Sequence, residues 1–127
     1  MNHRIGFNPL SRTSAERSAL LQGLVTSLFR YERIETTKAK ALEARKMAEK
    51  MITRAKTDSV HNRRIVDKNL KDEAVLNKLF TEIAPANADR NGGYTRILKI
   101  GYRNGDAAEM CILELVVKST KEEKTDK

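Results

Sequence analysis

The chain has few of the residues that build metal sites, disulfides and aromatic cores. Its 127 residues include one cysteine, two histidines and no tryptophan, and aromatic residues make up 5% of the total. The single Cys111 cannot form an internal disulfide, which fits a reducing compartment. So few cysteine and histidine ligands argue against a dedicated zinc site.

Long apolar runs are also absent. No stretch approaches the ~18 consecutive apolar residues of a membrane-spanning helix. The N-terminus carries no hydrophobic segment of the signal-peptide type. We therefore expect a cytoplasmic protein, and the length predicts a single domain with a modest core.

No catalytic constellation is evident. Cys111 lies between apolar neighbours in an expected strand, and nothing nearby in the sequence would activate its thiol. The adjacent carboxylates Asp72-Glu73 and Glu122-Glu123 lie at an expected helix start and in a polar tail, where solvation explains them. The sequence predicts a protein that is not an enzyme, and a small hydrolase is a remote alternative.

Positive charge is abundant and unevenly distributed. The formal net charge is +8, from 25 lysines and arginines against 17 acidic residues. Residues 1–56 hold twelve cations and five anions, residues 57–90 hold six of each, and residues 91–117 hold three of each. A compact domain with one basic side repels itself unless a polyanion neutralises it. Nucleic acid is the commonest such partner, and an anionic membrane surface is the second choice.

The rest of the chain is organised around residues 34–56. Residues 34–36 are typical of a short strand, and Thr37 can cap a helix because its hydroxyl can accept from a free amide in the first turn. Helical spacing then puts small apolar residues on one arc and cations on the opposite arc, diluted only by Glu43 and Glu49. The apolar arc holds Ala41, Ala44, Met47, Ala48, Met51, Ile52 and Ala55, and the basic arc holds Lys38, Arg45, Lys46, Lys50, Arg54 and Lys56.

Capping residues and a proline predict where the other helices begin and end. A capping box at residues 13–16 begins a helix that ends just before the first strand. Asp58 or Ser59 can cap a shorter helix. Asp72 can cap another, which Pro85 ends.

The last third of the chain predicts a β-hairpin. Residues 94–102 and 109–117 are rich in β-branched and aromatic residues, and Asn104-Gly105 lies between them. The strand at 34–36 must pair with this hairpin, because no other sheet is available. The predicted fold class is α+β, in the order α-β-α-α-α-β-β, with a small three-stranded sheet packed against helices.

Three segments make up the predicted domain organisation. Residues 1–12 have no usable period and are expected to form an extended, irregular basic arm. Residues 13–117 form a single α+β domain, and the polar residues 118–127 are expected to be a disordered tail.

Candidate nucleic-acid contacts come from the arm, the first two helices, the arginine pair at 63–64 and the glycine turn at 90–96. Guanidinium groups of a basic arm can bind phosphate or stack on a base. In the turn, glycine lets the backbone approach a phosphate, although a turn that leads into a strand explains the same residues. The predicted binding residues are His3, Arg4, Arg12, Arg17, Lys38, Lys40, Arg45, Lys46, Arg63, Arg64, Arg90, Tyr94 and Arg96.

Several motifs occur together in the order found in one known family. They are His3-Arg4, Leu10-Ser11-Arg12, Thr36-Thr37, the run 55–60 with Asn62-Arg63-Arg64, and the run 92–99 followed by Gly101, Arg103, Gly105-Asp106 and 114–116. With these motifs, residues 1 to about 117 resemble the bacterial large-subunit ribosomal protein L17 family. The most specific match is Gly92-Gly93-Tyr94-Thr95-Arg96-Ile97-Leu98-Lys99.

This resemblance implies an α+β protein with a small, three-stranded mixed sheet and a structural role on the large ribosomal subunit. It implies large-subunit ribosomal RNA and neighbouring ribosomal proteins as partners, with no membrane, cofactor or small-molecule substrate. The arm of such proteins is usually more basic than this one, which implies fewer phosphate contacts from the first ten residues and more weight on Arg4.

Two other interpretations stay open at this point. A DNA-binding protein would bind duplex DNA as well as RNA, but no convincing helix-turn-helix is present. An interaction module would bind protein through Leu42 and the edge of the hairpin, and this role is compatible with RNA binding.

Overall fold

The computed structural model describes residues 14–70 and 72–117. The expected arm at 1–12, Thr13 of the capping box and the expected tail at 118–127 lie outside these residues. The elements are α1 (Ser14–Tyr31), β1 (Arg33–Thr37), α2 (Lys38–Ala55), α3 (Val60–Asp67), α4 (Glu73–Lys78), the π-helical turn η1 (Leu79–Ile83), α5 (Ala84–Ala86), β2 (Thr95–Tyr102) and β3 (Glu109–Leu115). The predicted α+β class is confirmed.

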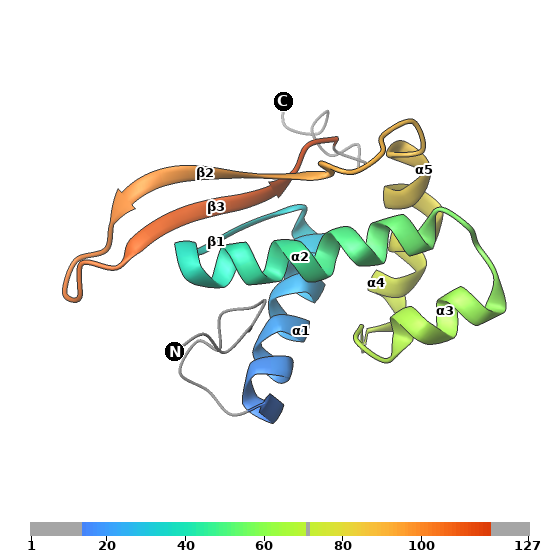
Figure 1. The fold of residues 1–127 in the computed structure, drawn as a ribbon, viewed down its shortest axis with the longest axis horizontal. Coiled ribbons are helices and arrows are strands. Elements are labelled where there is room, and N and C mark those ends of the chain that lie inside the picture. The colour runs from blue at the N-terminus through green and yellow to red at the C-terminus, as the bar shows by residue number, and fades with distance from the viewer. Residues whose placement is uncertain (1–13, 71, 118–127) are drawn as a thin grey trace, which may run out of the picture.

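The long helix α2 connects the two halves of the molecule (Figure 1). The Thr37 side chain accepts a hydrogen bond from the Lys40 amide, so β1 passes directly into a capped helix. The small apolar arc of α2 is buried, with Met47 only partly so. Alanines on this arc let the helix pack against β1, β2 and β3 as well as against α1. The predicted amphipathic division of α2 is confirmed.

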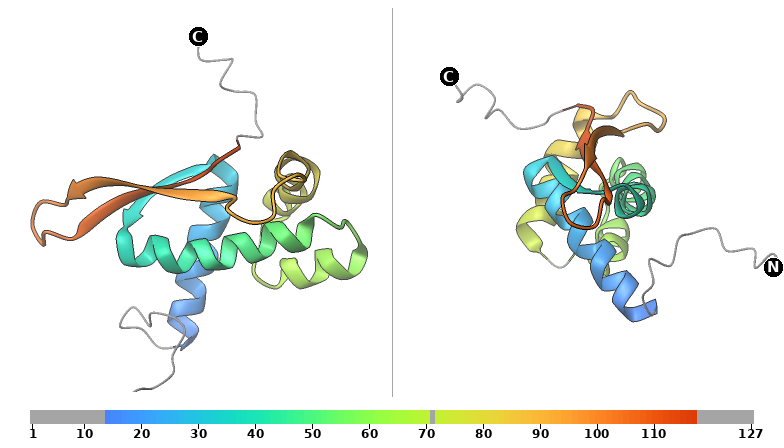
Figure 2. Two further views of the ribbon diagram at one scale, coloured as in Figure 1. Left: turned by 45° about the horizontal axis from the view of Figure 1, so that its top comes forward. Right: turned by 90° about the vertical axis from the view of Figure 1, so that its left-hand side faces the viewer.

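The three-stranded sheet has the order β1-β3-β2. Leu113 at its centre pairs with Ile34 of β1 and Ile97 of β2, so one apolar row crosses all three strands. The expectation of a mixed sheet was wrong, because β1 lies against β3, on the side away from β2, and both pairings are antiparallel. The hairpin β2–β3 extends past the N-terminal end of α2 (Figures 1 and 2).

The helices α3, α4 and α5 gather around the C-terminal half of α2 (Figure 1). The predicted caps are confirmed: Ser59 accepts from the Asn62 amide at 3.1 Å, and Asp72 accepts from the Ala74 amide at 2.9 Å. The helical path that begins with α4 continues through η1 and ends at Ala86, one residue after Pro85, where the sequence predicted its end. Pro85 lies in the first turn of α5, a position where a missing amide costs little.

Candidate nucleic-acid interface

A groove between α1, α2 and α3 brings cations from two helices together. Arg17 of α1 lines it with Lys46, Lys50 and Arg54 of α2. The groove, together with these four residues, is called the basic groove below. One carboxylate, that of Glu43, shares the groove, so its lining carries a clear positive excess.

The three α2 cations of the basic groove follow a spacing of four residues. This spacing stacks side chains on one face of a helix, one turn apart. All three are exposed. Lys46 forms an ion pair of 3.1 Å with Glu43, which is itself almost fully buried. The row therefore projects from a rigid helix that the core holds in place.

The floor of the basic groove is apolar. It is formed by Leu21, Met47, Met51, Ile65 and Val66, which come from all three helices. A cationic rim over an apolar floor can bind a phosphate backbone at the rim while an unstacked base or sugar lies on the floor.

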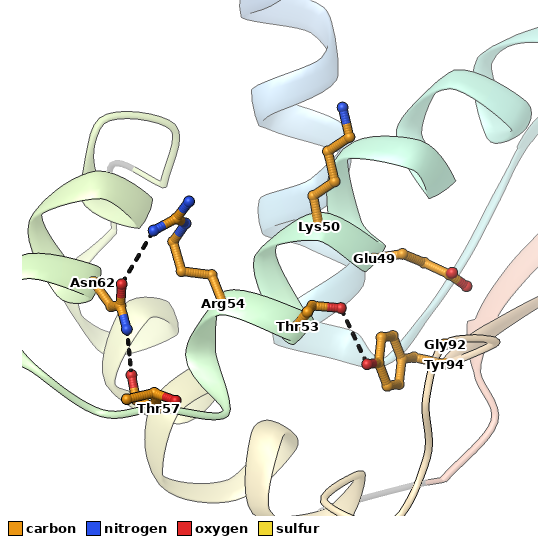
Figure 3. Close-up of a pocket in the computed structure, with 8 residues that line it drawn as sticks. All are labelled: Glu49, Lys50, Thr53, Arg54, Thr57, Asn62, Gly92 and Tyr94. Atoms are coloured by element: carbon orange, nitrogen blue, oxygen red, sulfur yellow. Dashed lines mark hydrogen bonds between the residues drawn. The ribbon is translucent and has the colours of Figure 1, made fainter.

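A second, polar cleft adjoins the basic groove across Lys50 and Arg54 (Figure 3). The Arg54 guanidinium donates to Asn62 Oδ1 at 3.1 Å, and Asn62 Nδ2 donates to the Thr57 carbonyl at 2.8 Å. These bonds connect the end of α2 with the start of α3. Lys50 and Arg54 thus border two adjoining concave surfaces, so their positions suit contact with a ligand that runs across α2.

The two acidic residues of α2 have structural partners. Besides the Glu43–Lys46 pair, Glu49 Oε2 accepts from the Thr95 amide at 3.2 Å and from Thr95 Oγ1 at 2.9 Å. Glu49 therefore connects the start of β2 to α2. The acids that dilute the basic arc in the sequence are used in packing.

Besides Lys46, three of the predicted binding residues are held in ion pairs. Lys38 lies 3.9 Å from Glu109, and Arg96 pairs with the buried Glu114. Arg63 donates two hydrogen bonds to Asp58, at 2.7 and 3.0 Å, and lies over the Phe80 ring. The hydrogen bonds from Arg63 lower the pKa of the Asp58 carboxyl. These cations have part of their hydrogen-bonding capacity already occupied.

Three other predicted residues have side chains without a bonding partner in the described part of the chain. Within residues 14–70 and 72–117, the side chains of Lys40, Arg45 and Arg64 have no hydrogen-bond or ion-pair partner. Arg64 is exposed, whereas Lys40 and Arg45 are half-buried along α2. These three are available for a phosphate.

Tyr94 does not fit the role predicted from the sequence. Its side chain is 1% exposed and belongs to the core. The backbone of Gly92 and Gly93, both at positive φ, turns the chain so that the ring enters the core beside α2. A buried ring is not available to stack on a base, so the turn interpretation of this segment accounts for Tyr94. Arg90 is exposed nearby.

The structure adds Lys50 and Arg54 to the candidate site. The sequence placed both on the basic arc, yet their shared position between two concave surfaces depends on how α1 and α3 pack. The spacing of Lys46, Lys50 and Arg54 is the signal that could have indicated them. His3, Arg4 and Arg12 lie outside the described residues.

The described residues lack two other kinds of functional feature. No helix in this part of the chain is long and apolar enough to span a membrane. Within the same residues, no group of three or more histidine, cysteine or acidic side chains could hold a metal ion.

Comparison with known families identifies the chain. The sequence model for ribosomal protein L17 matches residues 20–116, which is most of the chain. The chain belongs to the ribosomal protein L17 family. L17 proteins are structural components of the large ribosomal subunit that act in translation, and they are not enzymes. Family membership thus confirms the predicted structural, non-catalytic role.

Similar L17 proteins occur in Treponema and Borrelia species. The large ribosomal subunit protein bL17 of Treponema denticola is 61% identical over 116 residues, which cover 91% of this chain and 65% of that protein. The bL17 of Borrelia turicatae is 58% identical over 122 residues, covering 96% of this chain and 98% of the relative. The bL17 of Treponema pallidum (strain Nichols) is 60% identical over 116 residues, covering 91% of this chain and 71% of the relative.

Proposed function

We propose that this L17 protein binds large-subunit ribosomal RNA through the basic groove and stabilises the folded RNA in the assembled subunit. Family membership supports the ribosomal role, which in bacteria is cytoplasmic. The observation that carries the choice of surface is the convergence of Arg17, Lys46, Lys50 and Arg54 around one groove. Ribosomal RNA and neighbouring large-subunit proteins are the partners, and no small-molecule substrate is involved.

Electrostatics favours this surface over the rest of the molecule. Cations that neutralise phosphates release counterions from the RNA, and this release drives binding that weakens steeply as salt increases. The basic groove concentrates cations on helices that are held by the core, so binding there orders side chains but needs little ordering of the backbone.

The remaining predicted residues extend the proposed contact. Lys38, Lys40 and Arg45 continue along α2, and Arg64 and Arg90 are exposed at the end where α3 and the glycine turn lie. Arg63 and Arg96 can add hydrogen bonds from guanidinium nitrogens that their carboxylate partners leave unused. His3, Arg4 and Arg12 remain candidates for contacts by the arm.

Charge reversal in the basic groove tests the proposal. Lys50→Glu replaces an exposed cation that borders both concave surfaces. The full-length variant should bind a large-subunit RNA fragment more weakly than the parent, with the slope of log K against log salt reduced by about 1. In sucrose gradients of cell lysate, less of the variant should travel with large subunits.

The matched control is Lys68→Glu, which makes the same charge change at an exposed residue outside both concave surfaces. Both variants should keep the helical circular dichroism of the parent. Equal RNA binding by Lys50→Glu and Lys68→Glu would contradict the assignment of the groove. Equal or tighter binding of the parent to duplex DNA would favour the DNA-binding alternative.

A further inference from the structure

The hairpin β2–β3 exposes apolar side chains in a way that differs from the rest of the molecule. Five large apolar side chains are exposed among the described residues, and three of them lie on β2: Leu98 (41% exposed), Ile100 (46%) and Tyr102 (73%). The other two, Tyr31 and Val60, lie apart on α1 and α3. Apolar side chains gathered on a projecting strand indicate a contact surface.

The pairing register shows which face of the sheet is open. Cys111, Leu113 and Leu115 of β3 are buried against the helices. Side chains alternate along a strand, and directly paired residues share a face. Ile112 and its partner Leu98 therefore point to the opposite face. That face is only partly covered, as the exposure of Leu98 shows.

β2 is also an edge strand. It pairs with β3 on one side, and the order β1-β3-β2 leaves its other side without a strand among the described residues. The pairing register with β3 shifts at Ile100, between Lys99 and Gly101, so Leu98 and Tyr102 lie on opposite faces of the strand. An exposed edge strand with apolar side chains is an aggregation hazard unless a partner covers it, and a bulge reduces that hazard without removing it. A strand added to this edge would gain backbone hydrogen bonds and apolar contacts together.

The charges of the hairpin favour a polypeptide over RNA as the occupant of this edge. Arg103 pairs with Asp106 at 2.6 Å, and Lys99 lies 3.8 Å from Glu109, which Lys38 also approaches. Residues 91–117 hold three cations and three acids, so the segment has no net charge. A compensated, apolar edge offers little to a phosphate backbone and fits an uncharged, extended polypeptide.

We infer that the outer edge of β2, residues 98–102, binds an extended aliphatic segment of a neighbouring large-subunit ribosomal protein by strand addition. This inference rests on the proposed ribosomal function, because the neighbour is present only in the assembled subunit. It names a second surface, distinct from the basic groove, and a partner of a different chemical class.

Site-specific crosslinking tests the inference. Tyr102→p-benzoylphenylalanine places an aromatic photo-crosslinker on an exposed position of β2, and the same change at Tyr31, which is 66% exposed on α1, is the matched control. Each full chain is incorporated into large subunits reconstituted from ribosomal RNA and individually purified proteins. Position 102 should crosslink to a single ribosomal protein, at a segment that mass spectrometry identifies as extended and aliphatic.

A second variant separates this surface from the RNA contact. Leu98→Thr combined with Ile100→Thr keeps strand-forming residues but removes apolar surface, and should lower the yield of the position-102 crosslink by about tenfold. RNA binding by the same variant, measured on the isolated chain, should equal that of the parent. If RNA binding by the parent fails, the proposed function fails; if only the crosslink is unaffected, this inference fails alone.

Hydrogen exchange provides an independent readout. Amides in residues 98–102 should exchange more slowly in the reconstituted subunit than in the free chain, because strand addition gives them partners. Crosslinks from position 102 only to RNA or only to a second copy of this chain would overturn the inference. So would unchanged exchange at 98–102, or an equal loss of crosslinking at positions 31 and 102 in the double variant.

Discussion

The hydroxyl of Tyr94 lies 3.0 Å from Oγ1 of Thr53, which joins the loop before β2 to the C-terminal half of α2 (Figure 3). The Lys56 ammonium lies 4.8 Å from the centre of the Tyr94 ring and donates to the Arg90 carbonyl. The glycine turn is thus fixed against the helix that carries the basic groove. This attachment gives the tyrosine after the two glycines a structural role.

Removal of the Tyr94 hydroxyl should lower stability and leave RNA binding intact. Tyr94→Phe loses one neutral hydrogen bond, which should cost about 1 kcal/mol and lower Tm by about 4 °C. Thermal unfolding followed by circular dichroism measures the change, and Tyr31→Phe at an exposed ring should leave Tm unchanged. A variant that keeps the Tm of the parent but binds RNA more weakly would show that the hydroxyl contacts RNA.

Local chemistry was sufficient to predict the helix starts. Thr37, Ser59 and Asp72 each cap a helix, because a cap depends only on a side-chain oxygen and amides two or three residues further along the chain. The hairpin could also be predicted from the sequence, since the turn residues and the flanking β-forming residues lie within one short segment. The direction in which β1 pairs is a tertiary property, and there the expected mixed sheet was wrong.

The burial of two residues and the formation of the groove depend on tertiary packing, which the sequence did not predict. Glu43 was expected on a solvated arc, yet it is almost fully buried where α1 and α3 meet α2. Tyr94 was expected beside a phosphate, yet its ring lies in the core. The basic arc of α2 could be predicted from spacing alone. The groove that this arc borders could not be predicted from spacing, because Arg17 comes from another helix.

A buried ion pair connects α4 to the junction of α1 and β1. Lys78 Nζ lies 3.0 Å from Glu32 Oε2 and also donates to the Arg30 carbonyl at 2.9 Å. Glu32 is buried at a positive φ of 66°, where the chain leaves α1. Lys78→Ala removes the cation and leaves the carboxylate buried, which should cost about 3 kcal/mol.

Urea unfolding measures this loss of stability. Lys68→Ala, at an exposed lysine, should change the free energy of unfolding by less than about 0.5 kcal/mol. Equal stability of the two lysine variants would contradict a structural role for the Lys78–Glu32 pair.

The turn of the hairpin should depend on pH through Asp106. Hydrogen bonds from Arg103, and then from the Ala108 amide, lower the pKa of Asp106 to about 2. Because the folded pKa lies below the ordinary value of 3.8, this carboxylate stabilises the turn above pH 4. Its contribution is lost as the pH falls from about 4 towards 2.

Titration by NMR measures the pKa of the Asp106 carboxyl. Arg103→Ala should raise it towards the ordinary value, because the largest cause of the shift is removed. Asp106→Asn should abolish the titration step seen at the Ala108 amide, which donates to Asp106 Oδ1 at 3.1 Å. An unchanged Asp106 pKa in Arg103→Ala would show that the turn backbone alone holds the carboxylate.

The adjacent arginines of α3 should have separate roles. Arg63 is held by Asp58 and lies 4.8 Å from the centre of the Phe80 ring, whereas Arg64 is exposed and has no side-chain partner among the described residues. Arg63→Ala should lower Tm, because it removes the ion pair and the ring contact that connect α3 to its surroundings. Arg64→Ala should leave Tm unchanged.

RNA binding should respond in the opposite order. Arg64→Ala should reduce the slope of log K against log salt by about 1, as expected for one lost phosphate contact. Arg63→Ala should change that slope less, since Asp58 already neutralises much of its charge. Filter binding over a range of salt concentrations measures both slopes. A larger slope change for Arg63 than for Arg64 would mean that the RNA displaces Asp58, and that the phosphate contact lies on the Phe80 side of α3.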